Sequence, residues 1–561
     1  MSASRPVRVP FVRLALAGLV ALLLSVAIGA QPGAPMDVSA RIDKVFAPWS
    51  GEGSPGCAIA VGRGDSVIFT RAYGMANLEY GVRISPDTIF EAGSVSKQFT
   101  AAAIATLAGQ GKLSLDDDVR KYVPELPVLP TPITISELLH HTSGIRDQWT
   151  LLTLQGRPPG RDVHTFDEIL DLLGHQQGLN FKPNDEYLYS NSGYSLMSVI
   201  VQRVSGKSLA EFTEEQFFKP LGMKSTGWRS DFSRIVKNRA TAYSGANGKF
   251  RTDMPFTNVY GNGGLLTTVG DLLRWTHNLD TARVGGRALI DTLHRRGRLN
   301  DGTEIEYALG LNVTEHKGVP EVSHAGATAG YRAFLTRYPK QQLAIAVLCN
   351  LGSIVPERLA HQVADVYLEG QLKESSRPAT VTLSAADLAS HAGLYREPST
   401  DAFLRVEVKD GKLLVENVGA LAAIGAGRFQ AVDSATEFVF ASPTPGATVL
   451  RVGDGHSRPR EYVAIAEAHP AVERLAEYIG AYSSEELGVT YAVLADKEKL
   501  HVRLRPAPPR EVAALWADAF LLGGGDVLRF TRDASGRVDG FEVYAGRVRH
   551  LRFTRQARPT S

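Results

Sequence analysis

Charge of one sign and long hydrophobic runs are both scarce in this sequence. Its 61 basic residues are balanced by 59 acidic ones, and no basic run alternates with aromatic residues. Such a balance gives no reason to expect nucleic acid as a partner. The purely apolar or small stretch near the N-terminus, residues 14–28, is short of the roughly 20 residues that a membrane-spanning helix needs. No stable membrane span is therefore expected in the mature protein.

That short stretch has the features of a secretory signal peptide. Arg5, Arg8 and Arg13 precede it, and the small residues Gly29 and Ala30 follow it. We expect residues 1–30 to be removed by cleavage near Ala30 and the protein to be exported, to the periplasm or the medium. An uncleaved N-terminal anchor is the alternative. No cysteine lies near the cleavage region, which argues against a lipid anchor.

Cysteine is also rare, with Cys57 and Cys349 the only two in the chain. In an oxidising compartment they could form one bridge, but the sequence alone carries no information on the distance between them. Both lie in apolar runs typical of buried strands. From the residues alone, two unreactive buried thiols are the expectation.

A candidate nucleophile lies at the start of a helix-forming segment. Ser94 and Lys97 are one helical turn apart, just before the alanine-rich stretch 101–105. A serine hydroxyl needs a nearby base, and a partly buried lysine with a lowered pKa can serve as one. Backbone N–H groups at a helix start can also stabilise an oxyanion. The competing interpretation is a chance pairing in which Ser94 only caps the helix.

Two further stretches supply polar groups of the types that such a nucleophile would use. Tyr189 could relay a proton, and Asn191 could orient Lys97 or a substrate amide. Taken alone, the triplet Tyr189-Ser190-Asn191 is more typical of an Asx turn before a helix. His324 precedes the small residues Gly326 and Ala327, where a substrate backbone could lie close and the N–H of Ala327 could donate to an oxyanion. A lone histidine is by default a structural surface residue.

These stretches together resemble a known family. Their order and spacing are similar to the three motifs of the penicillin-recognising serine hydrolases, in the group that holds class C β-lactamases, D-aminopeptidases, DD-peptidases and family VIII-type esterases. The motifs are Ser94-Val95-Ser96-Lys97, Tyr189-Ser190-Asn191 and His324-Ala325-Gly326. The resemblance covers roughly residues 42–372. Flanking stretches are also similar: 138–145, 220–223 and 261–271.

The resemblance implies an α+β fold, a five-stranded antiparallel sheet with a helical subdomain and the site between them. It implies an acyl-enzyme on Ser94, with Lys97 and Tyr189 catalytic and with Asn191, His324, Gly326 and Ala327 binding the substrate or the oxyanion. No metal or organic cofactor is implied. In such a fold the first strand pairs with the last, so we hypothesise that Cys57 and Cys349 lie close enough to touch.

The third motif departs from the best-known members of this group. Many of them carry lysine where this chain has His324, and a histidine binds a carboxylate less firmly than a permanent cation. A His-x-Gly motif and a C-terminal extension of two β-modules look more like a D-aminopeptidase.

The chain is expected to contain three domains after the leader. The hydrolase domain would span residues 38–374, and two tandem β-modules would span 383–468 and 470–556. Their repetition is visible at an offset of about 87 residues, where Gly393-Leu394-Tyr395 is matched by Gly480-Ala481-Tyr482. Each module has enough short strands for a small barrel or sandwich. Neither carries an evident catalytic constellation.

The function that follows is hydrolysis of amide or ester bonds through an acyl-enzyme. The expected substrates are small peptides, esters or β-lactam-like compounds, with peptides of D-amino-acid or cell-wall type favoured. A short-chain esterase or weak β-lactamase is the alternative. The alternative from a different functional class is a penicillin-binding protein with little turnover. The residues carry no prediction of oligomeric state.

Overall fold

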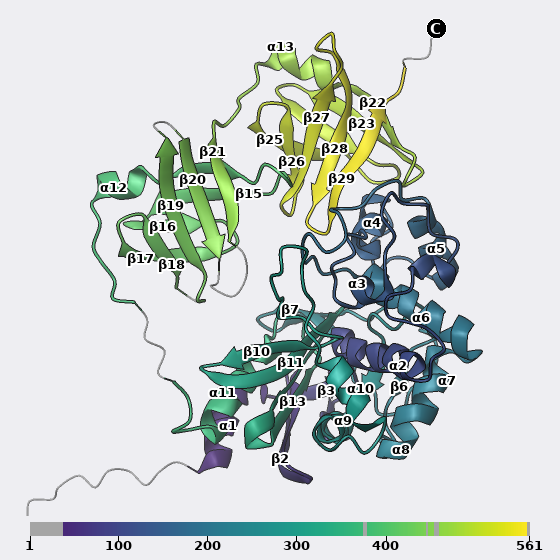
Figure 1. Cartoon of the computed structure of the whole chain (residues 1–561). Helices are drawn as coiled ribbons and strands as arrows, with labels where there is room; N and C mark the ends of the chain where they lie inside the picture. Colours follow the sequence, from purple (N-terminus) through teal and green to yellow (C-terminus); the bar gives the residue numbers. More distant parts are fainter. Residues whose placement is uncertain (1–36, 374–377, 433, 445–446, 454–458, 558–561) are drawn as a thin grey trace, which may run out of the picture.

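A computed structural model describes residues 37–373, 378–432, 434–444, 447–453 and 459–557. The expected signal peptide lies outside these residues. The chain forms an α+β domain followed by two β-barrels (Figure 1). Within the described part of the chain, no helix has the length and apolarity to cross a bilayer.

The α+β domain is built on a six-stranded sheet in which every neighbouring pair is antiparallel. Its order is β10 (Asn312–His316), β11 (Val319–Thr328), β12 (Tyr331–Tyr338), β13 (Leu343–Cys349), β1 (Cys57–Arg63) and β2 (Ser66–Tyr73). The expected antiparallel α+β fold is confirmed, but the count of five strands is wrong. Because β10 and β11 form a hairpin across the turn at Lys317, β10 adds a sixth strand at one edge.

Both faces of the sheet are covered by helices, which explains why its central strands are buried along their length. Ala58 and Ala60 of β1 pack with the cluster around α2 (Lys97–Gly109) and α9 (Val269–Thr281). Ile59 and Val61 point the other way, into a cluster with α1 (Val38–Phe46) and α11 (Pro356–Tyr367). Strands buried on both faces read as continuous apolar runs rather than as alternating ones.

Cys57 and Cys349 are direct partners in the register of β1 and β13, and they form a disulfide. Their Cα atoms are 4.1 Å apart. The hypothesis that the two residues touch is confirmed, and the expectation of two unreactive thiols is wrong. The sequence alone does not give the distance between the two cysteines. In the sheet, β1 lies beside β13, which brings them together.

The helical subdomain lies beside the sheet and surrounds α2. Predicted to begin near Ser94, this helix starts with a 3₁₀ turn at Gly93–Ser96 and continues as α2, which is buried almost all round. Its alanines allow neighbouring elements to approach closely. The other helices of the domain are α3 (Ile135–Leu139), α4 (Gln148–Leu154), α5 (Phe166–Gly174), α6 (Asn191–Ser205), α7 (Leu209–Thr213), α8 (Lys219–Leu221) and α10 (Gly286–Leu293).

Short strands complete the domain: β3 (Met75–Asn77) with β4 (Val82–Arg83), β5 (Phe90–Glu91) and β6 (Gly227–Trp228) on either side of β9 (Leu265–Thr267), and β7 (Tyr243–Ala246) with β8 (Lys249–Thr252). The last helix of the domain, α11, begins with Pro356 in its first turn and buries the face formed by Leu359, Ala360, Val363 and Ala364.

Both C-terminal modules are closed eight-stranded barrels. The first has the strands β14 (Gly393–Arg396), β15 (Phe403–Lys409), β16 (Lys412–Val415), β17 (Gly419–Gly425), β18 (Arg428–Ala431), β19 (Glu437–Thr444), β20 (Ala447–Gly453) and β21 (Arg460–Ile465), preceded by α12 (Ala385–Ala389). The second has β22 (Gly480–Ser484), β23 (Val489–Asp496), β24 (Lys499–Arg503), β25 (Arg510–Trp516), β26 (Ala519–Gly523), β27 (Asp526–Arg532), β28 (Val538–Ala545) and β29 (Val548–Arg555), preceded by α13 (Val472–Leu475). The repeated Gly-x-Tyr triplets begin the first strand of each barrel.

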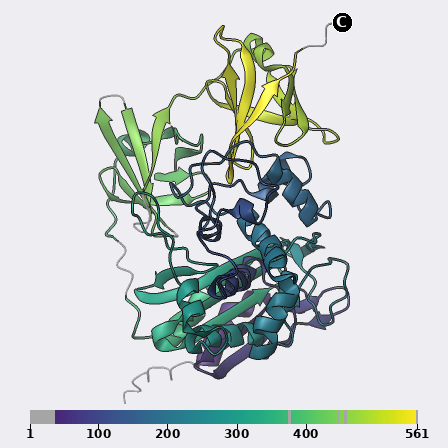
Figure 2. The same ribbon diagram turned by 45° about the vertical axis from the view of Figure 1, so that its right-hand side comes forward.

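The second barrel packs on the helical subdomain, as Figure 1 and the turned view of Figure 2 both show. Arg146, just ahead of α4, forms a buried ion pair with Glu486 of the barrel. The hydroxyl of Tyr491 donates to the carbonyl of Leu154 at the end of α4, at 2.6 Å. This barrel is therefore joined to the helices beside the predicted site.

Candidate active site

Ser94 lies in the 3₁₀ turn that leads into α2, where its side chain is only partly buried. The next turn of the chain brings Lys97 back beside it, with Nζ 3.1 Å from the Ser94 Oγ. Ser96, by contrast, turns inward and hydrogen-bonds to the carbonyl of Gly93. Of the hydroxyls in this turn, that of Ser94 is the one that faces the lysine.

Lys97 is fully buried and is held by three oxygen atoms. Besides the Ser94 Oγ, its ammonium group lies 3.0 Å from the Asn191 Oδ1 and 2.6 Å from the carbonyl oxygen of Asn262. Burial lowers the pKa of Lys97 well below its ordinary value, and the nearby positive charge of Arg547 lowers it further. The carboxylate of Asp147 acts in the opposite direction. A lysine with a lowered pKa beside a serine hydroxyl can act as its base.

Tyr189 covers the lysine with the face of its ring, whose centroid is 4.7 Å from the Lys97 Nζ. Its hydroxyl is buried next to the side chain of Ser94. Burial raises the pKa of Tyr189, whereas the neighbouring Ser94 and Arg547 lower it. A buried phenol beside the nucleophile can carry a proton to a leaving group.

Asn191 is fixed by a carboxylate that the sequence did not single out. Asp147 caps the N-terminus of α4, and its Oδ2 accepts from both the backbone N–H of Asn191, at 2.7 Å, and the side-chain Nδ2, at 2.8 Å. Since the amide nitrogen donates to Asp147, the Oδ1 must face Lys97. Asp147 therefore sets which atom of Asn191 the lysine meets.

The end of β11 supplies an open backbone edge beside Ser94. Its partner β10 begins at Asn312, opposite Ser323, so in the part of the chain that the structure describes no strand pairs with residues 324–328 on that side. Gly326 packs so tightly against the turn that a Cβ there would lie 2.0 Å from the carbonyl oxygen of Ala92. A Cβ at Gly93 would lie 2.5 Å from the backbone nitrogen of Ala327. The N–H groups of Ser94 and Ala327 are thus neighbours, as a pair of oxyanion donors must be.

His324 is buried next to this edge, and both of its ring nitrogens are engaged. Nδ1 lies 2.6 Å from the carbonyl oxygen of Ala325, and Nε2 lies 2.9 Å from the hydroxyl of Tyr307. A carbonyl can only accept, so Nδ1 carries the proton and Nε2 accepts from Tyr307. Burial, together with the charge of Lys97, lowers the pKa of His324 to about 3. The imidazole is therefore neutral at neutral pH and provides no cation for a substrate carboxylate.

A cation does reach the site, from the second barrel. Arg547 is at the tip of the hairpin between β28 and β29, and its guanidinium lies over the ring of Tyr189, with Cζ 4.8 Å from the centroid. No part of the sequence pattern marked this residue, because its position depends on how the barrel packs. No group of three or more His, Cys, Asp or Glu side chains suited to a metal occurs within the described ranges.

The structure thus brings Ser94, Lys97, Tyr189, Asn191, His324, Gly326 and Ala327 to one place. Residues 42–368, more than half of the chain, match the model of the family described as Beta-lactamase. The chain belongs to the beta-lactamase family. As a member of this family it is a serine hydrolase, related to D-aminopeptidases.

Relatives of this beta-lactamase family member extend the similarity past the hydrolase domain. A D-aminopeptidase of Gluconobacter oxydans is 28% identical over 77% of this chain and 80% of its own length. A D-aminopeptidase of Brucella canis is 24% identical over 89% of this chain and 96% of its own. Among solved structures, an octameric penicillin-binding protein homologue from Pyrococcus abyssi superposes with a TM-score of 0.53 at 21% identity, covering 84% of this chain and 98% of that one.

Besides Arg547, two residues of this beta-lactamase family site were missed by sequence reasoning. Asp147 carried a weak signal, an aspartate that could cap a helix, but nothing tied it to Asn191, which lies 44 residues further along the chain. Tyr307 carried no signal beyond its place in an apolar run. Both act on the predicted residues through contacts between distant parts of the chain.

Proposed function

We propose that this protein is an exported peptidase that forms an acyl-enzyme on Ser94 and acts on small peptides of D-amino-acid or cell-wall type. The observation that carries the proposal is Lys97, buried, with a lowered pKa, 3.1 Å from the Ser94 hydroxyl and beside two backbone N–H groups. Two D-aminopeptidases that match most of the chain support the substrate class. The apolar leader and the Cys57–Cys349 disulfide support export.

In the proposed reaction the Ser94 Oγ attacks the carbonyl carbon of the scissile bond while Lys97 takes the hydroxyl proton. The backbone N–H groups of Ser94 and Ala327 stabilise the oxyanion. Tyr189 gives its hydroxyl proton to the leaving nitrogen or oxygen, which breaks the bond and leaves the acyl group on Ser94, and it regains a proton from Lys97, which becomes neutral again. A water molecule, deprotonated by the same pair, then releases the acid and restores the serine.

The other groups hold this arrangement in place. Asn191 presents its Oδ1 to Lys97 because Asp147 holds its amide nitrogen. His324, neutral and bonded to Tyr307, fills the space between β11 and the site without adding charge. An uncharged imidazole adds no positive charge beside Lys97, whose own pKa is lowered.

The test is turnover of a matched panel by the full-length protein and its Ser94→Ala variant. The panel contains D-alanyl-D-alanine peptides, their L,L counterparts, p-nitrophenyl acetate and a penicillin. We expect Ser94-dependent cleavage with a preference for the D,D peptides. Cleavage of the ester without cleavage of any peptide would show that the protein is an esterase and not a peptidase. A lasting adduct with the penicillin and no turnover would replace it by a penicillin-binding protein.

A further inference from the structure

The hairpin tip that carries Arg547 is fixed to the hydrolase domain by its backbone. The carbonyl oxygen of Arg547 accepts from the Nδ2 of Asn180, at 2.9 Å, and from the backbone N–H of Asp147, at 3.3 Å. Two residues on, the N–H of Arg549 donates to the Oδ1 of the same Asn180, at 2.8 Å. The tip therefore has one place relative to α4 and to the residues that α4 positions.

The backbone of Arg547 is hydrogen-bonded to the hydrolase domain, whereas its side chain is not. Its guanidinium is exposed, lies on the ring of Tyr189, and has no hydrogen bond or ion pair to any residue that the structure describes. Arginines of the adjoining strand are different, since Arg549 pairs with Glu186 and Arg552 with Asp539. An unpaired guanidinium against the ring of Tyr189 is a preformed site for a planar anion.

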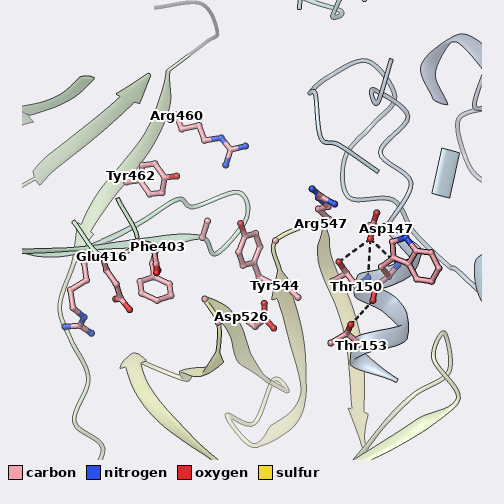
Figure 3. A pocket seen from close by; sticks show the side chains of 18 of the residues that line it. Asp147, Thr150, Thr153, Phe403, Glu416, Arg460, Tyr462, Asp526, Tyr544 and Arg547 are labelled. Carbon is pink, nitrogen blue, oxygen red and sulfur yellow. Dashed lines mark hydrogen bonds between the residues drawn. The ribbon is translucent and has the colours of Figure 1, made fainter. Parts of the chain in front are cut away.

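Arg547 also faces a cavity of about 610 Å³ at the junction of the three domains. Figure 3 shows its walls: Asp147, which caps α4, with Thr150 and Thr153 of that helix on one side, Phe403, Arg460 and Tyr462 of the first barrel on the other, and Tyr544 of the second barrel between them. The cavity adjoins the site at Asp147 and Arg547, which both line it. It offers room for the part of a substrate that lies away from the scissile bond.

We propose that the guanidinium of Arg547 binds a carboxylate of the substrate, so that the second barrel selects acidic substrates for the hydrolase domain. The inference rests on the proposed function and narrows its substrate class. The third motif cannot supply the charge, because His324 is neutral and has both nitrogens engaged. Lys97 has to be neutral to act as a base. Arg547 is then the cation that lies against Tyr189, whereas Arg405 and Arg460 line the cavity from the first barrel.

The experiment measures binding without turnover, in the full-length Ser94→Ala protein, by calorimetry. Two matched pairs of ligands are compared. N-acetyl-D-alanyl-D-alanine and its C-terminal amide place the carboxylate in the leaving group. N-glutaryl-D-alaninamide and its terminal amide place it in the acyl part. We expect the acid of at least one pair to bind about tenfold or more tightly than its amide, the size of effect typical of a charge-assisted hydrogen-bonded pair.

Substitution of the arginine then has to remove that preference. Arg547→Gln should bring the acid-to-amide ratio below about twofold, and Arg547→Lys should keep part of it, because the charge remains but the bidentate geometry is lost. Arg552→Gln is the matched control, since it removes the same charge from β29 away from the cavity, and it should leave the ratio unchanged. A ratio that survives Arg547→Gln overturns the proposal. So does the absence of acid preference in both pairs, including undetectable binding of both acids.

Turnover by the Ser94-containing protein separates this result from the proposed function. If the acids bind through Arg547 but no substrate is cleaved in a Ser94-dependent way, the hydrolytic proposal fails and the carboxylate site remains. If peptides are cleaved with equal efficiency as acids and amides, by the parent and by Arg547→Gln alike, the hydrolytic proposal remains and the carboxylate site fails.

Discussion

Lys97 is the residue whose protonation state decides what Ser94 can do. It is enclosed by Ser94, Asn191 and the carbonyl of Asn262, with the rings of Tyr189 and Tyr194 at 4.7 and 5.4 Å from its Nζ. Burial disfavours the charged form, and a second cation at Arg547 disfavours it again. Arg547, which we assign to substrate binding, therefore also lowers the pKa of the base Lys97.

A pH profile tests this coupling. Because Lys97 must lose its proton to act, kcat/KM for p-nitrophenyl acetate should rise with pH through the lowered pKa of Lys97. Arg547→Gln removes a positive neighbour, so it should raise that pKa and move the midpoint to higher pH. The uncharged ester separates this effect from carboxylate binding. Arg552→Gln should leave the midpoint in place; a midpoint that stays fixed or moves down in Arg547→Gln contradicts the assignment.

His324 makes a prediction of its own about stability. Its pKa is about 3 in the folded protein and about 6.5 in an unfolded chain, so between these values the unfolded state binds more protons. The free energy of unfolding should therefore rise with pH across this window, by up to about 1.4 kcal/mol per pH unit from this group alone. Urea denaturation at pH 4.5 and 7 should show a smaller difference for His324→Gln than for the parent protein. Equal differences would mean that the histidine is not held neutral.

At the scale of elements, the site depends on how closely β11 approaches the turn before α2. The pair Gly93 and Gly326 allows this approach, and β10 begins only at Asn312, opposite Ser323, so no described strand covers the edge at residues 324–328. A substrate backbone can then add to the sheet edge as a further strand. The oxyanion donors come from the two elements that meet here.

Gly326→Ala should disrupt this contact. Its Cβ would lie 2.0 Å from the carbonyl oxygen of Ala92 and 3.0 Å from the backbone nitrogen of Ser94, so the strand has to move away and one donor is lost. We expect kcat to fall by about a hundredfold, as for loss of one oxyanion donor. Gly62→Ala in β1 is the control, because its Cβ would make only ordinary contacts, 3.5 Å from the Leu273 side chain and 3.7 Å from the carbonyl oxygen of Ser66. Full activity in a folded Gly326→Ala protein would contradict this account of the edge.

The elements of the fold could be largely predicted from the sequence, and so could the residues whose chemistry is local. Ser94 and Lys97 are one turn apart, and Tyr189 and Asn191 belong to one short motif. Each pair can therefore be recognised within one short stretch of sequence. Asp147 and Arg547 could not be found in this way. Each has a function only because a distant segment packs against it, and a lone aspartate or arginine has no spacing to recognise.

At the scale of the whole molecule, the second barrel is a structural part of the site. The carbonyl of Arg547 accepts from the N–H of Asp147, and the Asp147 carboxylate holds Asn191 beside Lys97. Arg146, one residue earlier, is buried and donates to the carbonyls of Arg549 and His550 as well as to Glu486. The barrel and the start of α4 are thus one hydrogen-bonded unit, and the barrels are joined in turn by Arg529, which pairs with Asp401 of the first.

Two adjacent glutamates make this connection testable. Glu486→Gln leaves the buried Arg146 without its counter-ion, which should cost about 3 kcal/mol of stability, the lower end of the effect of breaking a buried ion pair. It should also lower kcat/KM, because Asp147 follows Arg146 directly. Glu485→Gln is the control, since that side chain is exposed and, among the described residues, accepts a hydrogen bond only from Gln177, at 3.2 Å; it should change stability by less than about 0.5 kcal/mol. Equal thermal stability and activity of the two variants would show that the barrel does not support the site.

The claim that all of this depends on is the acyl-enzyme at Ser94. Intact-mass spectrometry of the full-length protein, taken within seconds of mixing with p-nitrophenyl acetate, measures it most directly. The account predicts one added acetyl group that disappears as turnover proceeds, and no addition in the Ser94→Ala variant. An unmodified protein that still releases p-nitrophenol, or an adduct that persists in Ser94→Ala, would contradict it.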